Sequence, residues 1–164
     1  MKHHLPPLVL GMMLATGPVL PGAAQDTVFV IRHAERDYVN GGVLEEGRQR
    51  AHAWGEVLAD AGLDVVITSE KPRTRQTGQP IADRLDIPII VIPRADYDGL
   101  LERLETEFVD DRVLIVSHSS SIPVILRRLG HPTYVLVPKS DYNDLFVLRP
   151  DDDGPPDVVR LNVD

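Results

Sequence analysis

Short runs of apolar residues alternate with helix-like segments along most of the chain, and this alternation constrains the fold more than any other feature. The runs lie at residues 28–31, 65–68, 89–92 and 113–116. Runs of this length, bounded by polar residues or proline, are typical of strands that are buried on both faces. Because amphipathic segments separate them, the sequence predicts a mostly parallel central sheet with helices on both faces, a three-layer α/β/α sandwich.

Four segments with apolar residues at three- and four-residue steps predict the helices. They lie at residues 44–61, 72–85, 98–108 and 122–129. Three later runs, 134–137, 145–148 and 158–161, are strand candidates, and the last two are expected to form a hairpin around the turn-forming residues 150–156. No repeat, linker or change of composition indicates a second domain, so residues 25–164 are expected to form one domain.

The first 24 residues are expected to be a secretory signal peptide and not part of the fold. Lys2 precedes a mostly apolar stretch at residues 8–20, and small residues follow it at a suitable cleavage site near Ala24. The stretch is short for a membrane span, so no stable membrane insertion is expected after cleavage. We therefore expect a secreted or periplasmic protein, and its lack of cysteine excludes disulfides.

The acidic composition argues against nucleic acid as a partner. The formal net charge is −8, whereas binding to a polyanion requires an excess of basic side chains. A protein of this charge that binds a phosphoryl group has to concentrate positive charge locally. The candidates follow the first two predicted strands, and they are Arg32, Arg36, Lys71, Arg73 and Arg75.

Two of the predicted strands are followed closely by a histidine. Arg32 and His33 come directly after the first strand, and His118 lies two residues past the fourth. Functional groups of open α/β sheets gather at the carboxyl ends of the strands, so these residues are expected to lie close together. Arginine offers a fixed fork of donors to phosphate oxygens, and imidazole is a nucleophile or proton carrier. The pattern therefore indicates chemistry on a phosphate group.

These motifs, taken in order, resemble the histidine phosphatase superfamily, which is also called phosphoglycerate mutase-like. The matching segments are Arg-His-Ala-Glu at 32–35, residues 44–51 with Gly47-Arg48, residues 69–77, and Val-Ser-His at 116–118. Residues 141–148 also resemble the C-terminal part of small bacterial members without a cap domain. The resemblance covers nearly all of residues 25–164 and implies the phosphoglycerate mutase-like form of the α/β/α sandwich.

The resemblance also implies a role for each site residue. His33 would be the nucleophile that forms a phosphohistidine, with its second ring nitrogen donating to a nearby carbonyl group. Arg32 and Arg73 would bind the phosphoryl oxygens, His118 would contact the same oxygens as a charged donor, and Ser119 would add a further contact. The site is expected to hold a phosphate or sulfate anion and to need no metal or cofactor. Should Arg73 be only a surface residue, its neighbours Arg75 and Lys71 are the alternatives.

The general acid is the least determined part of the site. Phytase-like members carry an aspartate directly after the second histidine, where this chain has Ser119. Mutase-like members take a glutamate from the segment after the third strand, where this chain offers Asp96 and Asp98. Both residues are also suited to capping a helix, and Glu35 remains a further candidate. Without an acid, substrates with good leaving groups such as phosphohistidine would be favoured.

The sequence thus predicts an exported phosphatase acting on phosphomonoesters or phosphoramidates. Its partner would be a phosphorylated small molecule or a phosphoprotein. A phosphohistidine-protein phosphatase and a phosphatase of envelope phosphosugars are two forms of this hypothesis. The alternative from a different class is a non-catalytic phosphate-binding or interaction protein of the same fold, although binding alone would not require a nucleophile.

Overall fold

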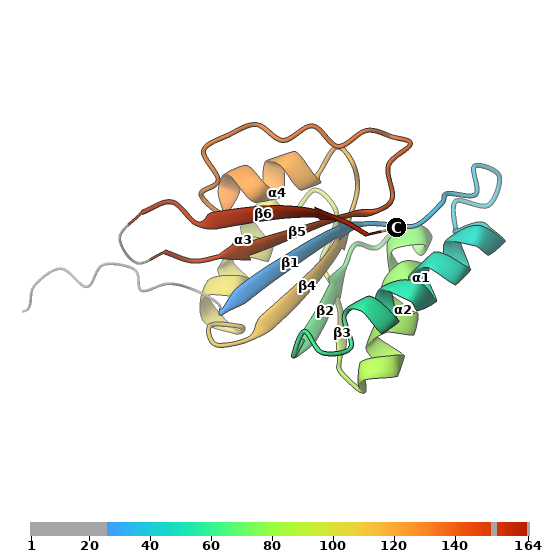
Figure 1. Cartoon of the computed structure of the whole chain (residues 1–164), viewed down its shortest axis with the longest axis horizontal. Helices are drawn as coiled ribbons and strands as arrows, with labels where there is room; N and C mark the ends of the chain where they lie inside the picture. Colours follow the sequence, from blue (N-terminus) through green and yellow to red (C-terminus); the bar gives the residue numbers. More distant parts are fainter. Residues whose placement is uncertain (1–25, 152–153, 164) are drawn as a thin grey trace, which may run out of the picture.

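A six-stranded sheet with helices on both faces forms the protein, seen in a computed structural model that describes residues 26–151 and 154–163 (Figure 1). The strands are β1 (Thr27–Arg32), β2 (Val65–Thr68), β3 (Ile89–Val91), β4 (Arg112–Ser117), β5 (Asp144–Arg149) and β6 (Asp157–Asn162). The helices are α1 (Glu45–Val57), α2 (Pro72–Leu85), α3 (Tyr97–Thr106) and α4 (Ile122–Arg128). This arrangement confirms the predicted α/β/α sandwich.

The strand order β3-β2-β4-β1-β5-β6 divides the sheet into a parallel and an antiparallel part. The first four strands in this order are mutually parallel, so their carboxyl ends lie at one edge. β5 runs antiparallel to β1, and β6 runs antiparallel to β5. These last two strands form the hairpin that the sequence predicted. The sheet is therefore mostly parallel, and the central strand β1 has a parallel neighbour on one side and an antiparallel one on the other.

The two faces of the sheet carry separate hydrophobic cores, because successive side chains of a strand point to opposite faces. Val28 and Val30 of β1 pack in the core that α3 and α4 cover. Phe29 and Ile31 pack in the other core, which includes Trp54 of α1 and residues of α2. Every residue of β1 is buried. This double burial explains why the apolar runs of the sequence are continuous and do not alternate with polar residues.

Residues 134–137 form no strand, which corrects the sequence prediction. Tyr134 and Leu136 are exposed, whereas Val137 is buried and Val135 packs against the core on the α3–α4 face. The alternating pattern therefore reflects packing of one side of the segment against the core, and not pairing in the sheet. Several backbone carbonyl groups in residues 136–141 accept hydrogen bonds from arginine side chains instead of from a neighbouring strand.

A further difference concerns the end of α1. The predicted first helix extends to residue 61, but α1 ends at Val57 and turns follow before Gly62, whose φ is +66°. Leu58 still packs in the core, which accounts for the longer apolar pattern. The expected signal peptide lies outside the described residues. In the part of the chain that the structure describes, no helix is both long and apolar enough to span a membrane.

Candidate active site

The two histidines lie side by side because β1 and β4 are in parallel register. Arg32 pairs with Ser117 at the carboxyl end of this ladder, and the N–H of His33 donates to the carbonyl of Ser117 at 2.9 Å. The next residue along β4 is His118, and the two imidazole centroids are 5.2 Å apart in an edge-to-face arrangement. Both histidines are almost completely buried, because only 4% of the surface of His33 and 3% of that of His118 is exposed. The predicted convergence of the two strand ends is therefore present.

One hydrogen bond fixes the tautomer of His33. Its Nδ1 lies 2.7 Å from the carbonyl oxygen of Ala34, which only accepts, so Nδ1 carries the proton. Nε2 is then unprotonated and holds a free lone pair. Burial lowers the pKa of His33 to about 4, against the Ala34 hydrogen bond that raises it, and the charges of Arg32 and Arg73 lower it further. At neutral pH the ring is uncharged, as a nucleophile requires.

His118 is held between an arginine and a serine. Nη2 of Arg73 lies 3.2 Å from its Nδ1, and the hydroxyl of Ser69 lies 3.1 Å from its Nε2. Burial, and then the charges of Arg73 and His33, lower the pKa of His118 to about 3. The ring is therefore neutral at neutral pH in the described structure, which differs from the charged donor that the resemblance implied. A phosphoryl dianion beside the ring would raise this pKa.

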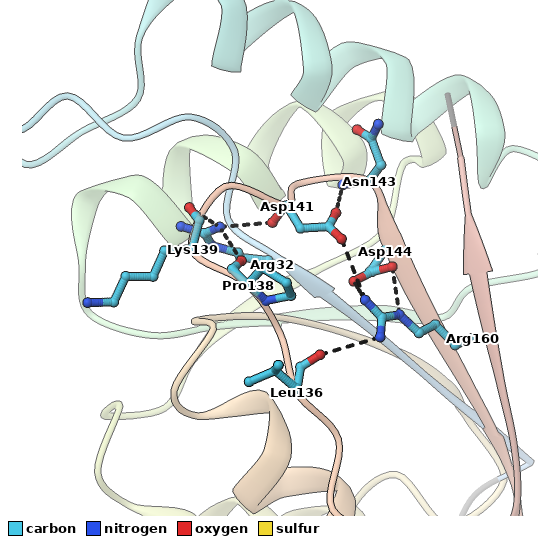
Figure 2. A network of polar contacts seen from close by, with 8 residues as sticks. All are labelled: Arg32, Leu136, Pro138, Lys139, Asp141, Asn143, Asp144 and Arg160. Atoms are coloured by element: carbon cyan, nitrogen blue, oxygen red, sulfur yellow. Dashed lines mark hydrogen bonds and ion pairs between the residues drawn. The ribbon is translucent and has the colours of Figure 1, made fainter.

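Arg32 is oriented by a loop more than one hundred residues away in sequence (Figure 2). Its Nη1 donates to the carbonyl oxygens of Pro138, Lys139 and Asp141 at 3.1, 2.7 and 2.8 Å. The guanidinium also lies over the ring of Tyr142, 4.0 Å from the centroid. Within residues 26–151 and 154–163, its Nε is buried without a hydrogen-bond partner. These contacts fix one side of the guanidinium and leave donors on the other.

The first turn of α2 brings Arg73 to the same place. Pro72 begins the helix. The hydroxyl of Ser69, which precedes the helix, lies 2.8 Å from the hydroxyl of Thr74 in its first turn. Thr77 links the helix to the nucleophile segment, because its hydroxyl donates to the carbonyl of Arg73 and accepts from the N–H of Ala34 at 3.0 Å. This arrangement supports Arg73, and not the exposed Arg75, as the residue that faces the histidines.

More charged groups act on the site than the sequence pattern indicated. After burial, the charges of Arg36 and Arg94 lower the pKa of Arg73, and Arg94 also acts on His118. The guanidinium of Arg94 donates to the hydroxyls of Ser120 and Ser121. Glu70 opposes these charges, and its bonds with Lys71 and the N–H of Arg94 lower its own pKa to about 2. The excess of arginine over carboxylate makes the site suited to an anion.

The candidate acids have other partners. The carboxylate of Asp96 accepts from the N–H of Gly99 at 2.9 Å and caps α3, while Asp98 is highly exposed and forms an ion pair with Arg128. Glu35 is buried and forms an ion pair with Arg50, with Oε1 and Nη2 2.6 Å apart.

Ser119 is half-buried directly after His118. In the described residues, no group of three or more metal-ligating side chains is arranged to hold a metal ion.

No role for Ser69 or Tyr142 was predicted from the sequence, although both lie in segments that carry the resemblance. Ser69 stands directly after β2, so its position at the sheet edge was a usable signal, although a lone serine there has many other roles. Tyr142 reaches Arg32 only because β5 pairs beside β1, and no local pattern predicts that pairing. The segment just before the antiparallel strand β5 therefore supplies a fourth set of site residues, besides those that follow the parallel strands β1, β2 and β4.

Comparison with known proteins supports this description. The family model of the histidine phosphatase superfamily (branch 1) matches residues 28–96, which include Arg32, His33 and Arg73. The chain is 30% identical over 76 residues to Probable phosphoglycerate mutase GpmB of Erwinia tasmaniensis. That match covers 41% of this chain and 35% of the relative, so the chain aligns with about a third of that protein's length.

Solved structures share the fold at low sequence identity. A mycobacterial glucosyl-3-phosphoglycerate phosphatase in complex with VO3 has a TM-score of 0.67 and 15% identity, covering 85% of this chain and 100% of that one. The candidate phosphohistidine phosphatase SixA from Agrobacterium tumefaciens has a TM-score of 0.60 and 20% identity, and the match covers 76% of this chain and 92% of that one. The family match, which runs from β1 to the cap of α3, agrees with this shared fold. The family match over residues 28–96 and the shared fold therefore agree with the resemblance of the chain to the histidine phosphatase superfamily.

Proposed function

We propose that this protein is an exported phosphatase that hydrolyses phosphomonoesters or phosphoramidates through a phosphohistidine on His33. The observation that carries the proposal is the hydrogen bond from Nδ1 of His33 to the carbonyl of Ala34. It holds the neutral tautomer whose Nε2 lone pair is free to attack phosphorus. A buried histidine with a structural role would instead be expected to use both ring nitrogens in hydrogen bonds.

The first step would form a bond between Nε2 of His33 and phosphorus while the bond from phosphorus to the leaving oxygen or nitrogen breaks. The leaving atom keeps the electron pair of that bond. Arg32 and Arg73 would bind the non-bridging oxygens, where their charges stabilise the transition state. Water would then attack the phosphohistidine, restoring neutral His33 and releasing inorganic phosphate. His118, which receives a hydrogen bond from Arg73, would contact the same oxygens.

The fate of the leaving-group proton favours phosphoramidates over esters with poor leaving groups. Asp96 caps a helix and Asp98 pairs with Arg128, so neither carboxylate is reserved for proton donation. Glu70, with a pKa of about 2, carries no proton at neutral pH. Departure of an unprotonated alkoxide is unfavourable. A phosphohistidine nitrogen, in contrast, is a good leaving group once its imidazole is protonated in solution.

Two further observations support the proposal. The structures that share this fold include a phosphatase complex with VO3, a phosphatase complex with inorganic phosphate, and a candidate phosphohistidine phosphatase. The apolar N-terminal stretch of the sequence supports export. Export by itself would favour an envelope phosphosugar as the substrate, whereas the partners of Asp96 and Asp98 favour a phosphohistidine protein, which needs no proton donor for its leaving group. The two forms of the hypothesis therefore predict different turnover of a sugar phosphate.

Turnover by residues 25–164 in the presence of EDTA is the direct test. p-Nitrophenyl phosphate supplies a good leaving group, phosphohistidine supplies the P–N bond, and a sugar phosphate supplies a poor leaving group. We expect turnover of the first two, little turnover of the third, and loss of all turnover in His33→Ala. A phosphorylated His33 trapped by acid quench and detected by mass spectrometry would establish the intermediate.

A matched control is His52→Ala, because His52 is exposed on α1 and contributes no contact to the site. Equal activity of His33→Ala and His52→Ala would contradict the nucleophile assignment. Binding of phosphate without turnover of any of the three substrates would instead favour the non-catalytic phosphate-binding protein.

A further inference from the structure

The loop that orients Arg32 is itself contacted by the charged side chain of Arg160, which bonds to its backbone and to the carboxylate of Asp141 (Figure 2). Residues 136–141 belong to no strand or helix, so no ladder of backbone hydrogen bonds fixes them. Yet the carbonyl groups of Pro138, Lys139 and Asp141 all accept from one nitrogen of Arg32. A change of this loop would therefore rotate or release the guanidinium that binds phosphate.

Asp141 connects this loop to the rest of the fold through its side chain. Its Oδ1 accepts from the N–H of Asn143 at 3.1 Å, and its Oδ2 lies 3.5 Å from Nη2 of Arg160. Its backbone carbonyl accepts from Arg32 at 2.8 Å. The same residue therefore contacts Arg32 through its backbone and the supporting network through its carboxylate.

Arg160 is held firmly enough to support the loop. It lies on β6, and its guanidinium makes two bonds to the buried carboxylate of Asp144, with Nε and Oδ1 2.8 Å apart. Its Nη1 also donates to the carbonyl of Leu136 at 3.4 Å. The buried carboxylate of Asp144 thus holds the guanidinium of Arg160 in one position, and the bonds between them raise the pKa of Arg160. The guanidinium thus reaches both ends of the segment 136–141.

We infer that the contact between Asp141 and Arg160 positions Arg32 for phosphoryl binding through the carbonyl groups of residues 138–141. Asp141 and Arg160 are positioning residues in this arrangement and contact no substrate. The inference deepens the proposed function and rests on it, because Arg32 is taken as the phosphate ligand. A second ion pair, Glu35 with Arg50, reaches the adjacent Asn143 through Arg50 Nη1 and supports the same loop from the α1 side.

The variants have to separate positioning from loss of the fold. Removing Arg160 would leave Asp144 buried and unpaired, which is strongly destabilising. Asp141→Ala leaves the Asp144–Arg160 pair intact and removes only the contacts of the Asp141 carboxylate. Asp141→Asn keeps an acceptor for the N–H of Asn143 and removes the charge that faces Arg160. The matched control is Arg84→Met, which breaks the ion pair between Arg84 and Glu56 on α2 and α1.

The experiment is a double-mutant cycle of Asp141→Ala with Arg32→Ala, read by calorimetric binding of orthovanadate and by kcat/KM for p-nitrophenyl phosphate. We expect Asp141→Ala to weaken vanadate binding and lower kcat/KM about tenfold when Arg32 is present, because small displacements of a positioning group are costly. With Arg32 replaced, the same change should alter binding less than about twofold, since coupled residues are non-additive. Asp141→Asn should give a smaller loss, and Arg84→Met should give none.

An equal loss in both backgrounds, or no loss in either, would overturn the inference. Binding of vanadate by the unaltered protein without turnover would overturn the proposed hydrolysis, while the binding cycle would still decide the role of Asp141. Failure of the unaltered protein both to bind vanadate and to turn over substrate would overturn both proposals together.

Discussion

Nη2 of Arg73 lies 3.2 Å from Nδ1 of His118, and this contact sets the proton positions of the second histidine. Arginine is always a donor, so Nδ1 accepts and the proton of the neutral ring lies on Nε2. Nε2 then donates to the hydroxyl of Ser69 at 3.1 Å. His33 carries its proton on Nδ1 and His118 on Nε2, so the two neighbouring imidazoles have opposite tautomers.

Replacing Arg73 should therefore damage two functions of the site together. Arg73→Ala removes a phosphate ligand and the donor that orients His118, and we expect kcat/KM for p-nitrophenyl phosphate to fall at least about 100-fold. Arg73→Lys keeps a charge but not the planar fork, and should recover only part of this loss. Arg75→Ala is the control, because Arg75 is exposed two residues later on the same helix. If Arg75→Ala proved the more damaging change, the assignment of the phosphate ligand would be incorrect.

The pH dependence of kcat/KM should reveal the low pKa of His33. A protonated imidazole cannot attack phosphorus, and burial lowers its pKa from 6.5 to about 4. The enzyme should therefore keep its nucleophile at pH 5 to 6, where an ordinary histidine is mostly charged, and lose activity as the pH falls through about 4. The profile is corrected for the ionisation of the substrate, and circular dichroism at each pH checks that the protein stays folded. An acid limb of the enzyme near pH 6.5 would refute this prediction.

The aspartates near α3 give a test of where the leaving-group proton comes from. Asp96→Ala removes the cap of α3 and should lower the free energy of unfolding by about 1 kcal/mol, measured by urea denaturation. Asp98→Asn breaks an exposed ion pair and should cost less. Neither change should alter turnover of phosphohistidine. A selective loss of ester hydrolysis in one variant would identify that residue as the general acid.

The sequence predicted the parallel half of the fold and the residues at its strand ends. Each of these strands contains a continuous apolar run, and burial on both faces accounts for the runs of β1, β2 and β4, whereas the edge strand β3 is only partly buried. Arg32, His33 and His118 follow directly from that register, because parallel strands place their carboxyl ends together. The prediction rests on local pattern combined with one general rule of sheet topology.

The contacts of Arg32 could not be predicted in the same way. They depend on a loop whose alternating apolar residues suggested a strand, and on β5 pairing antiparallel beside β1. The charge state of His118 depends on its burial and on the neighbouring Arg73, which only the assembled site supplies. Long-range pairing and desolvation are properties of the whole fold, whereas a motif reports only the residue types.

The close approach of α1 to the nucleophile segment is a further constraint, which Gly47 makes possible. A Cβ at this position would lie 2.9 Å from the backbone oxygen and 3.0 Å from the backbone nitrogen of Glu35, two residues after His33. Gly47→Ala should therefore push helix and loop apart, lower the free energy of unfolding by about 1–3 kcal/mol and reduce turnover.

Gly55→Ala on the same helix is the control. Its Cβ would come close, at 3.0 Å, to Cδ of the flexible Arg84 side chain, while the backbone of Ile81 would lie at an ordinary contact distance of 3.7 Å. Since alanine is also the better helix former, stability should be equal or higher. Thermal unfolding and kcat/KM of the two variants are measured side by side. Equal behaviour would mean that the contact between α1 and residue 35 does not constrain the site.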